Sequence, residues 1–368
     1  MVWELQSTGV IGGKVKFKIV LADKNNPDHI CAIQRLWDNN LRFIGEGRFE
    51  WLYQNNPAGD TITCLAVVEK TGEIIGTASA MCRNFHFDGK TFKAGIAIDF
   101  AIDVEYRVFG PALLLQRTLV EQAWGQGLDF MLGFPNLASQ GIVRRVGYER
   151  IGNSMRFSRL IRTRDKLTAV LRERGLPTLL AGPASVVLDA GLYLKTRLSG
   201  SQGTARTIAS EKEFGDYQWR AFQYGNIATH TFHGEYGEDF IRWRYLQCPY
   251  KDYQLFSLFD EQQPVAFLVF SFSDNGLVLV DDFRYLEEKW LAPLFHHFWR
   301  KMHRNVHVAI NVGLVVGENT EKLMTDAGFI ARPSERWGGI LSNPDISMDW
   351  RKILNEGGWY IADGEIDL

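Results

Sequence analysis

The chain has 368 residues, 46% of them hydrophobic and 23% charged, which is long enough for two domains of ordinary size that each bury a core. No low-complexity tract is present, so the composition excludes a disordered or fibrous protein. Lys and Arg number 41 against 43 Asp and Glu, and the net charge of −2 excludes the general basic field that binds nucleic acids.

The sequence carries no signs of secretion or membrane insertion. Its first residues lack a basic segment followed by an apolar run, and its four cysteines are scattered without a Cys-x-x-Cys pair. The most apolar window, residues 176–194, is interrupted by prolines, glycines and Asp189, which argues against a membrane-spanning helix. We expect a cytoplasmic protein with reduced thiols and no stable membrane insertion, and leave weak contact with a membrane surface open.

A weak internal repeat divides the chain. The pattern Trp-x-Tyr-x-x-x-Pro begins at Trp51 and recurs at Trp243, an offset of 192 residues. Two strand-like runs joined by a polar turn follow each copy, and then a strand that ends in Asp-Phe, at Asp99 and at Asp282. Each copy closes on a Gly-aromatic pair. Landmarks in the same order predict two related domains.

The stretch between the two copies has a different pattern. It begins with the helical spacing of Leu167, Val170 and Leu171 and ends in a Ser/Gly-rich run. This pattern predicts helices that join the domains, followed by a flexible tether.

One turn in the first copy has the features of an anion site. An apolar strand, residues 97–102, and an amphipathic helix that starts at Ala112 flank Arg107 and Gly110. A helix start has unpaired N–H groups, Gly lets a phosphate approach the backbone, and Arg adds a charge-assisted hydrogen bond. The turn is predicted to hold a diphosphate, unless its Gly and Pro only set the geometry of an ordinary strand–helix connection.

The sequence after this helix gives the turn more weight. A short strand, residues 129–133, leads to Phe-Pro-Asn-Leu-Ala-Ser, and a second helix, residues 140–146, ends at Gly147-Tyr148. The order Asp-Phe-Ala-Ile, Tyr-Arg-x-x-Gly-x-Ala, helix, strand, Phe-Pro-Asn-x-x-Ser, helix, Arg-x-Gly-Tyr resembles the GNAT superfamily of N-acetyltransferases. The likeness is closest to two-domain members with an N-terminal Trp-x-Tyr-x-x-x-Pro segment.

The resemblance implies an α/β (mixed α+β) fold with two tandem GNAT-like domains, each a mixed, mostly antiparallel twisted sheet flanked by helices. It covers residues 15–160 well and the later residues only through the repeat. The expected division is an acyl-CoA-binding domain at 15–160, a helical linker and tether at 161–205, and a degenerate second domain at 206–360.

Acetyl-CoA, or another acyl-CoA, is the co-substrate that the resemblance implies. In the family the turn binds the pyrophosphate, the preceding strand pairs with the pantetheine arm, and the next loop meets the cofactor. Pro111 departs from the usual pattern and supplies no N–H, so one donor is lost. The implied contacts are Ala101, Ile102, Arg107, Val108, Phe109, Gly110, Ala112, Asn136 and Ser139.

Two residues are candidates for acid–base catalysis. Family enzymes often place a carboxylate base on the strand before the turn; here Asp99 either acts as that base or hydrogen-bonds the backbone at a strand irregularity. Many members carry a Tyr four residues before the final Gly, where it protonates the leaving thiolate, but this chain has Val143. Tyr148, water or another group then serves as the acid, or the domain binds acyl-CoA and catalyses poorly. The alternative role for Tyr148 is to pack its ring in the core.

The second copy lacks a phosphate turn. After Asp282 the sequence has no Gly, and it carries Glu287 and Glu288 where a diphosphate would have to lie. This half is therefore expected to have lost acyl-CoA binding, and to close the acceptor cleft or hold the fold together. The Trp segments are expected to be mainly architectural. A histidine cluster includes the neighbours His296 and His297, which point to different faces of a helix, so no metal is expected.

The predicted function is transfer of an acyl group, in the first instance acetyl, from acyl-CoA to a primary amine of a small molecule such as an amino sugar, amino acid or polyamine. Two alternatives stay open. One is a Fem-type aminoacyl or peptidyl transferase, because those also resemble two fused GNAT domains. The other is a non-catalytic acyl-CoA-binding module. The oligomeric state is open, with a homodimer among the options.

Overall fold

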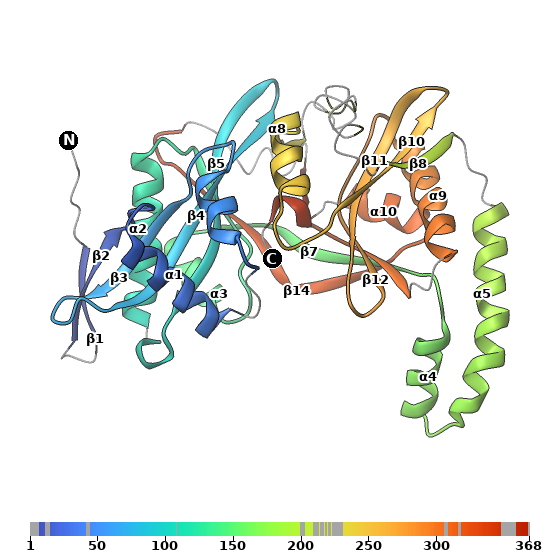
Figure 1. Ribbon diagram of the computed structural model, residues 1–368, viewed down its shortest axis with the longest axis horizontal. Helices are drawn as coiled ribbons and strands as arrows, with labels where there is room; N and C mark the ends of the chain where they lie inside the picture. The colour runs from blue at the N-terminus through green and yellow to red at the C-terminus, as the bar shows by residue number, and fades with distance from the viewer. Residues whose placement is uncertain are drawn as a thin grey trace.

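The computed structural model describes residues 7–11, 15–41, 45–107, 109–198, 203–208, 231–304, 308–315, 318–346 and 358–366, together with residues 213, 217, 219 and 222 (Figure 1). Helices cover a long mixed sheet whose strands come from both halves of the chain. The mixed α/β fold in two tandem units, predicted from the sequence, is confirmed. Among the described residues, no helix combines the length and the apolar character needed to cross a membrane.

The first half begins with a hairpin and ends with a long strand. Asn26 caps its first helix by accepting a hydrogen bond from the N–H of Asp28, and Pro27 occupies the first helical position. Its elements are β1 Ser7–Ile11, β2 Val15–Leu21, α1 Pro27–Asn40, the π-helical η1 Glu50–Gln54, β3 Ile62–Val68, β4 Ile74–Phe87, β5 Lys90–Ile102, the 3-10 turn η2 Val104–Tyr106, α2 Phe109–Gly125, β6 Phe130–Gly133, α3 Gln140–Val146 and β7 Glu149–Leu160.

The helices predicted between the two copies form a hairpin at the outer edge of the molecule (Figure 1). They are α4 Arg164–Glu173 and α5 Ala181–Leu198, joined through η3 Thr178–Leu180. The predicted tether falls partly on residues 199–202, which lie outside the described residues. A strand, β8 Thr204–Ile208, begins within its last residues and pairs with the second half.

The second half repeats the element order of the first. Its described elements are β9 Phe232–Gly234, α8 Glu238–Ile241, the π-helical η4 Arg242–Leu246, β10 Gln254–Asp260, β11 Gln263–Phe272, β12 Leu277–Tyr285, η5 Glu288–Trp290, α9 Leu291–His303, β13 Ala309–Val315, α10 Glu318–Asp326, β14 Ile330–Ser342, β15 Trp359–Ala362 and η6 Asp363–Glu365.

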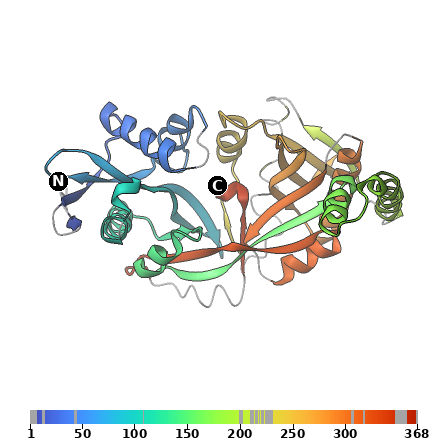
Figure 2. The same ribbon diagram turned by 90° about the horizontal axis from the view of Figure 1, so that it is seen from below.

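The two halves exchange their last long strands. The sheet order is β1-β2-β3-β4-β5-β6-β14-β7-β13-β12-β11-β10-β8, so β14 of the second half pairs with β6, and β7 of the first half pairs with β13. β7 and β14 also pair with each other, and Figure 2 shows them running from one half into the other. The sequence ranges 15–160 and 206–360 therefore share strands, and their division into domains stays a prediction.

The repeated Trp segments meet at the centre of the molecule. The indole N–H of Trp51 donates to the carbonyl of Trp243 at 2.8 Å, and the indole of Trp243 donates to the carbonyl of Trp51 at 2.8 Å. Their rings stack with centroids 5.1 Å apart, and both side chains are buried. The reciprocal contacts give the two copies a local two-fold relation, with one core cluster between the halves and two others under α2 and α9.

Candidate functional site

The predicted anion turn lies where β5 passes through η2 into α2. Gly110 is exposed in the first turn of α2, and a Cβ atom there would meet nothing within 4 Å. The first turn of α2 contains no acidic residue, so the positive end of the helix dipole is not offset there. Ala112 packs partly against the core of the first half. Val108 lies outside the described residues, as does the side chain of Phe109. This helix start can accept an anion.

Arg107 holds the turn to its surroundings. Its Nε donates to the carbonyl of Ile102 at 3.0 Å, and its Nη2 donates to Oδ1 of Asn40 at 2.6 Å. A second link joins α1 to the same turn, because Arg35 and Asp103 form an ion pair at 2.8 Å. Two guanidinium groups therefore fix the end of β5 against α1.

Beside this turn the strands β5 and β6 separate, and we call the place where they stop pairing the opening. β5 and β6 pair in parallel up to Ala97 and Gly133, but β5 continues to Ile102. In the described residues, no strand pairs with this edge of β5 beyond Ala97, whereas its other edge stays paired with β4. Ala101 and Ile102 are buried residues on this edge, and the carbonyl of Ile102 accepts the hydrogen bond from Arg107. An extended ligand with amide groups can pair with such an edge.

Asn136 and Ser139 lie in the loop that joins the end of β6 to α3. Oδ1 of Asn136 accepts hydrogen bonds from the N–H and the hydroxyl of Ser139, both at 3.1 Å. Asn136 is exposed and Ser139 is half-buried. These contacts fold the loop at the start of α3 and keep Asn136 at the surface beside the opening.

Asp99 lies in the first half at an irregularity of β5. It has a left-handed φ of 50°, and the pairing of β4 with β5 shifts register between Thr77 and Ser79. Its carboxylate accepts hydrogen bonds from Arg48 at 2.8 and 3.0 Å and from the hydroxyl of Tyr53 at 2.7 Å. The predicted irregularity is present, but the carboxylate binds these side chains. Both contacts stabilise the charged carboxylate.

The contact with Asp99 also affects the pKa of Tyr53. Burial raises the pKa of its phenol well above the ordinary 10, and the charge of Asp99 raises it further. Its hydroxyl also lies 2.9 Å from the hydroxyl of Ser79. The Tyr of the repeated motif is therefore a neutral hydrogen-bond donor that links η1 to β5.

Tyr148 is buried at the point where the sheet opens. Gly147 ends α3 in the left-handed conformation, with φ of 114°, and delivers Tyr148 to the start of β7. The ring packs on Gly133, where a Cβ atom would meet Cε1 of Tyr148 at 3.2 Å. Among the described residues the hydroxyl has no hydrogen-bond partner, and burial raises the pKa of the phenol above its ordinary 10. Tyr148 thus packs in the core and also keeps a free O–H.

In the second half the corresponding opening is filled. β12 and β13 pair in parallel only up to Val280 and Val312, and β15 then pairs with the end of β13. η6 follows β15 into the same region, where a Cβ atom on Gly313 would overlap the carboxylate of Asp363. The space between the diverging strands is occupied by the chain itself.

Buried polar groups hold this filled opening. Asp282 accepts hydrogen bonds from the hydroxyls of Tyr236, Tyr245 and Tyr360, and burial raises its pKa to about 8. The nitrogen atoms of the buried Arg284 have no hydrogen-bond partner among the described residues, and its guanidinium lies over the rings of Tyr236 and Tyr360, at 3.8 and 4.2 Å.

A buried ion pair joins this region to the first half. Arg83 on β4 donates to Glu365 in η6 at 2.7 and 3.1 Å, with both side chains almost fully buried. The contact ties residues 282 positions apart in the sequence. It also places the filled opening of the second half next to the long β4–β5 hairpin.

Sequence reasoning did not find several of these polar residues. Arg48 lies three residues before Trp51, and this closeness to the repeat is the one signal that points to it. Arg83 and Glu365 have no pattern that pairs them. In the described part of the chain, no group of three or more His, Cys, Asp or Glu side chains is placed to hold a metal ion. The predicted histidine cluster includes His307, which lies outside the described residues.

Comparison with solved structures identifies the fold. No family model and no curated protein matches the sequence. Solved structures do match. A protein from Enterococcus faecalis, described as a probable N-acyltransferase, is 10% identical with a TM-score of 0.61, over 89% of this chain and 72% of that one. A GCN5-related N-acetyltransferase from Anabaena variabilis is 14% identical with a TM-score of 0.56, over 88% of this chain and 72% of that one.

A longer match covers both halves. The N-myristoyltransferase of Saccharomyces cerevisiae, with bound myristoyl-CoA, is 11% identical with a TM-score of 0.58, over 96% of this chain and 85% of that one. The chain has the GNAT fold. The resemblance stated from the sequence is therefore confirmed at the level of fold, and the GNAT fold extends over both halves of the molecule.

Proposed function

We propose that the first half is an acyl-CoA-dependent N-acyltransferase, with acetyl-CoA as the first co-substrate to test and a small primary amine as acceptor. The observation that carries the proposal is the opening between β5 and β6 beside the exposed start of α2. The GNAT fold of the solved neighbours supports it. A cytoplasmic location belongs to the same proposal.

The residues around the opening suit a diphosphate and its pantetheine arm. The backbone at Gly110 and Ala112 provides N–H donors at the positive end of α2, while Pro111 provides none. The unpaired edge of β5, at Ala101 and Ile102, can hydrogen-bond amides of the arm. We expect Asn136, in the loop that follows β6, to contact the cofactor as well. When bound, acyl-CoA supplies the activated thioester.

The transfer needs one proton to leave the amine and one to reach the thiolate. The amine nitrogen forms a bond to the thioester carbonyl carbon and the C–S bond breaks. The thiolate leaves, and the acyl group stays bound to the nitrogen. We assign Asp99 as acceptor of the amine proton, positioned by Arg48 and Tyr53. We assign Tyr148 as donor to the thiolate, because its protonated hydroxyl is free and lies at the end of β6.

Thiol release from acetyl-CoA against a panel of amines tests the proposal. We expect turnover with at least one amine, a kcat lowered about 100-fold or more in Asp99→Asn and in Tyr148→Phe, and an unchanged kcat in Arg172→Glu, an exposed position on α4. Release that is equal in all variants would remove these residues from the reaction.

A second measurement separates catalysis from binding alone. If calorimetry detects acetyl-CoA binding but no amine supports thiol release, the first half is a binding module, which Val143 in place of the family Tyr would explain. If neither binding nor release is detected, the opening between β5 and β6 has another role and the proposal fails.

A further inference from the structure

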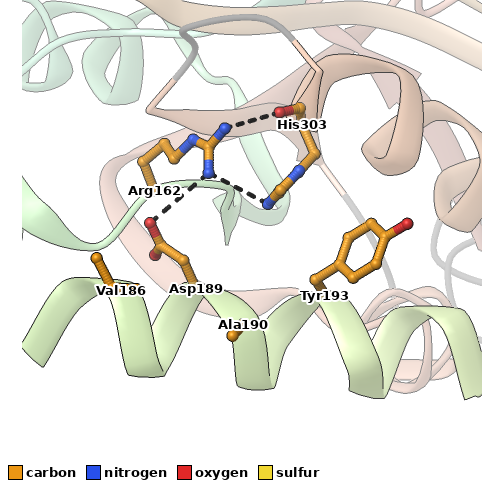
Figure 3. A pocket seen from close by; sticks show the side chains of 6 residues that line it. All are labelled: Arg162, Val186, Asp189, Ala190, Tyr193 and His303. Carbon is orange, nitrogen blue, oxygen red and sulfur yellow. Dashed lines mark hydrogen bonds and ion pairs between the residues drawn. The ribbon is translucent and has the colours of Figure 1, made fainter.

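α5 contacts the body of the protein through polar groups and through Leu192 and Tyr193. Asp189 accepts hydrogen bonds from the N–H and the hydroxyl of Thr163, both at 2.9 Å, and lies 3.9 Å from Arg162. Arg162 in turn contacts His303 of α9, and Figure 3 shows these residues around a hollow of about 310 Å³ between α5 and the body. The buried side chains of α5 are the small or polar Ala181, Ser185 and Thr196.

The opposite side of α5 is apolar and exposed. The exposed fractions of its large side chains are 72% for Val187, 54% for Leu194 and 82% for Leu198, and Leu180, the last residue of η3, is 57% exposed. A surface helix normally buries its apolar stripe and exposes its polar one. α5 exposes these side chains although Leu192 and Tyr193 of the same helix already pack against the body, which is the pattern of a helix whose second apolar partner lies outside its own chain.

The exposed stripe has the spacing of a helix–helix seam. The residues that line it are Leu180, Ala184, Val187, Gly191, Leu194 and Leu198. Their intervals alternate between four and three residues, which is the repeat that keeps one stripe facing a partner helix. All six are exposed.

This seam complements itself in an antiparallel pair. When two copies of α5 run in opposite directions about the middle of the seam, Ala184 of one copy faces Leu194 of the other, and Val187 faces Gly191. In the middle of the seam each large side chain then meets a small one. At both ends two large side chains meet, because Leu180 of one copy faces Leu198 of the other. A surface that fits its own copy in this way is what a two-fold interface requires.

Gly191 has no role within its own chain. It lies inside a helix, its φ is not positive, and a Cβ atom there would meet nothing within 4 Å. Glycine weakens a helix interior, so its place here needs another reason. A close approach of Val187 from a second helix provides one.

We propose that α5 forms the interface of a homodimer, packed antiparallel against α5 of a second copy. The α4–α5 hairpin lies at the outer edge of the second half (Figures 1 and 2), so the body of the protein leaves the seam accessible. With Leu179 beside it, the seam offers large apolar side chains of about 60–120 Å² each. Two copies together bury an area on the order of 1,000 Å², where specific interfaces begin.

Analytical ultracentrifugation of the full chain tests the proposal. We expect a concentration-dependent dimer, loss of the dimer in Val187→Glu with unchanged thermal stability, and an unchanged dimer in Val104→Glu. Val104 is the matched control, because its exposed fraction is also 72% and it lies in the first half. A monomer at all concentrations would overturn the proposal.

A second variant separates packing from charge. Gly191→Leu adds an apolar side chain where the seam needs a small one, so we expect the dimer to weaken at least tenfold. If Gly191→Leu dimerises as well as the native chain, the antiparallel register is wrong. If the native chain is monomeric but sediments with anionic vesicles, and Gly191→Leu sediments more strongly, then α5 binds a membrane surface and the dimer is rejected.

Discussion

The two halves build the same strand geometry and use it differently. In the first half β5 separates from β6 beyond Ala97, and no described strand enters the gap. In the second half β12 separates from β13 beyond Val280, and β15 with η6 enters. The diverging strands are therefore a property of the fold, whereas an open gap is a property of the first half alone.

The groups around each gap show what the difference means. The first gap lies beside an exposed helix start and a short exposed loop. The second is lined by Asp282, Arg284 and Glu365, which are buried and contact tyrosine rings or Arg83. A gap filled by its own chain cannot also hold a long cofactor arm.

The largest loss of unfolding free energy is expected at the contact between Trp51 and Trp243, where the two halves are equivalent. Trp51→Ala and Trp243→Ala should each lower the unfolding free energy by about 3–5 kcal/mol, because each removes a buried ring and one of two reciprocal hydrogen bonds. The double variant should lose less than the sum, since the two rings contact each other. Urea unfolding measures all three proteins, and strictly additive losses would contradict the symmetric contact.

Breaking the ion pair between Arg83 and Glu365, which holds η6 in the second gap, is expected to lower the unfolding free energy slightly less. Glu365→Ala leaves the buried Arg83 without its carboxylate and should cost about 3 kcal/mol. Asp60→Ala is the control, because it breaks the exposed pair with Lys24 and should cost less than about 1 kcal/mol. Equal thermal stability of the two variants would show that the ion pair of Glu365 does not hold η6 in place.

Asp282, at the second gap, should make the unfolding free energy depend on pH. Its pKa is raised by burial from 3.8 to about 8. A carboxyl group with a raised pKa stabilises the fold fully below pH 3.8 and loses that contribution as the pH rises to about 8. Relative to Asp282→Asn, the native chain should therefore lose up to about 1.4 kcal/mol of unfolding free energy per pH unit across this window. Urea unfolding across the window measures this, and parallel pH profiles would contradict it.

The smallest free-energy change is expected at the open gap, where stability and affinity should move apart. Gly110→Asp adds a carboxylate to the start of α2, which favours the helix but repels a diphosphate. We expect the KM for acetyl-CoA to rise about tenfold, or about 1.4 kcal/mol, with unchanged or higher thermal stability. Lys289→Glu, at the corresponding place before α9, should leave the KM unchanged. A rise in both variants would mean that overall charge is responsible.

The local elements of both halves follow from the sequence because short-range rules fix them. Asn26 with Pro27 starts α1, Gly147 ends α3, and the Asp99 strand leads into a turn and α2, as their patterns predict. The repeat at Trp51 and Trp243 predicts two related units for the same reason, since spacing survives where residue identity does not.

The contacts that distinguish the halves do not follow from the sequence because they join distant segments. Nothing in β7 or β14 says which of two equivalent sheets each will complete. The entry of β15 depends on space left by β12, and the ion pair of Arg83 with Glu365 forms only after that entry. The position of Asp99 on β5 is predictable from the pattern. The ion pair of Asp99 with Arg48 forms only when the segment that leads into η1 has packed against β5.

The exchanged strands also set the order in which the protein can be made. Gly133 of β6 pairs with Gly339 of β14, so the sheet that carries the proposed acyl-CoA opening lacks this neighbouring strand until β14 of the second half has left the ribosome. Contacts between residues so far apart in sequence slow folding and leave strand edges exposed meanwhile. During synthesis, the half that is translated first must therefore wait for the half that is translated last.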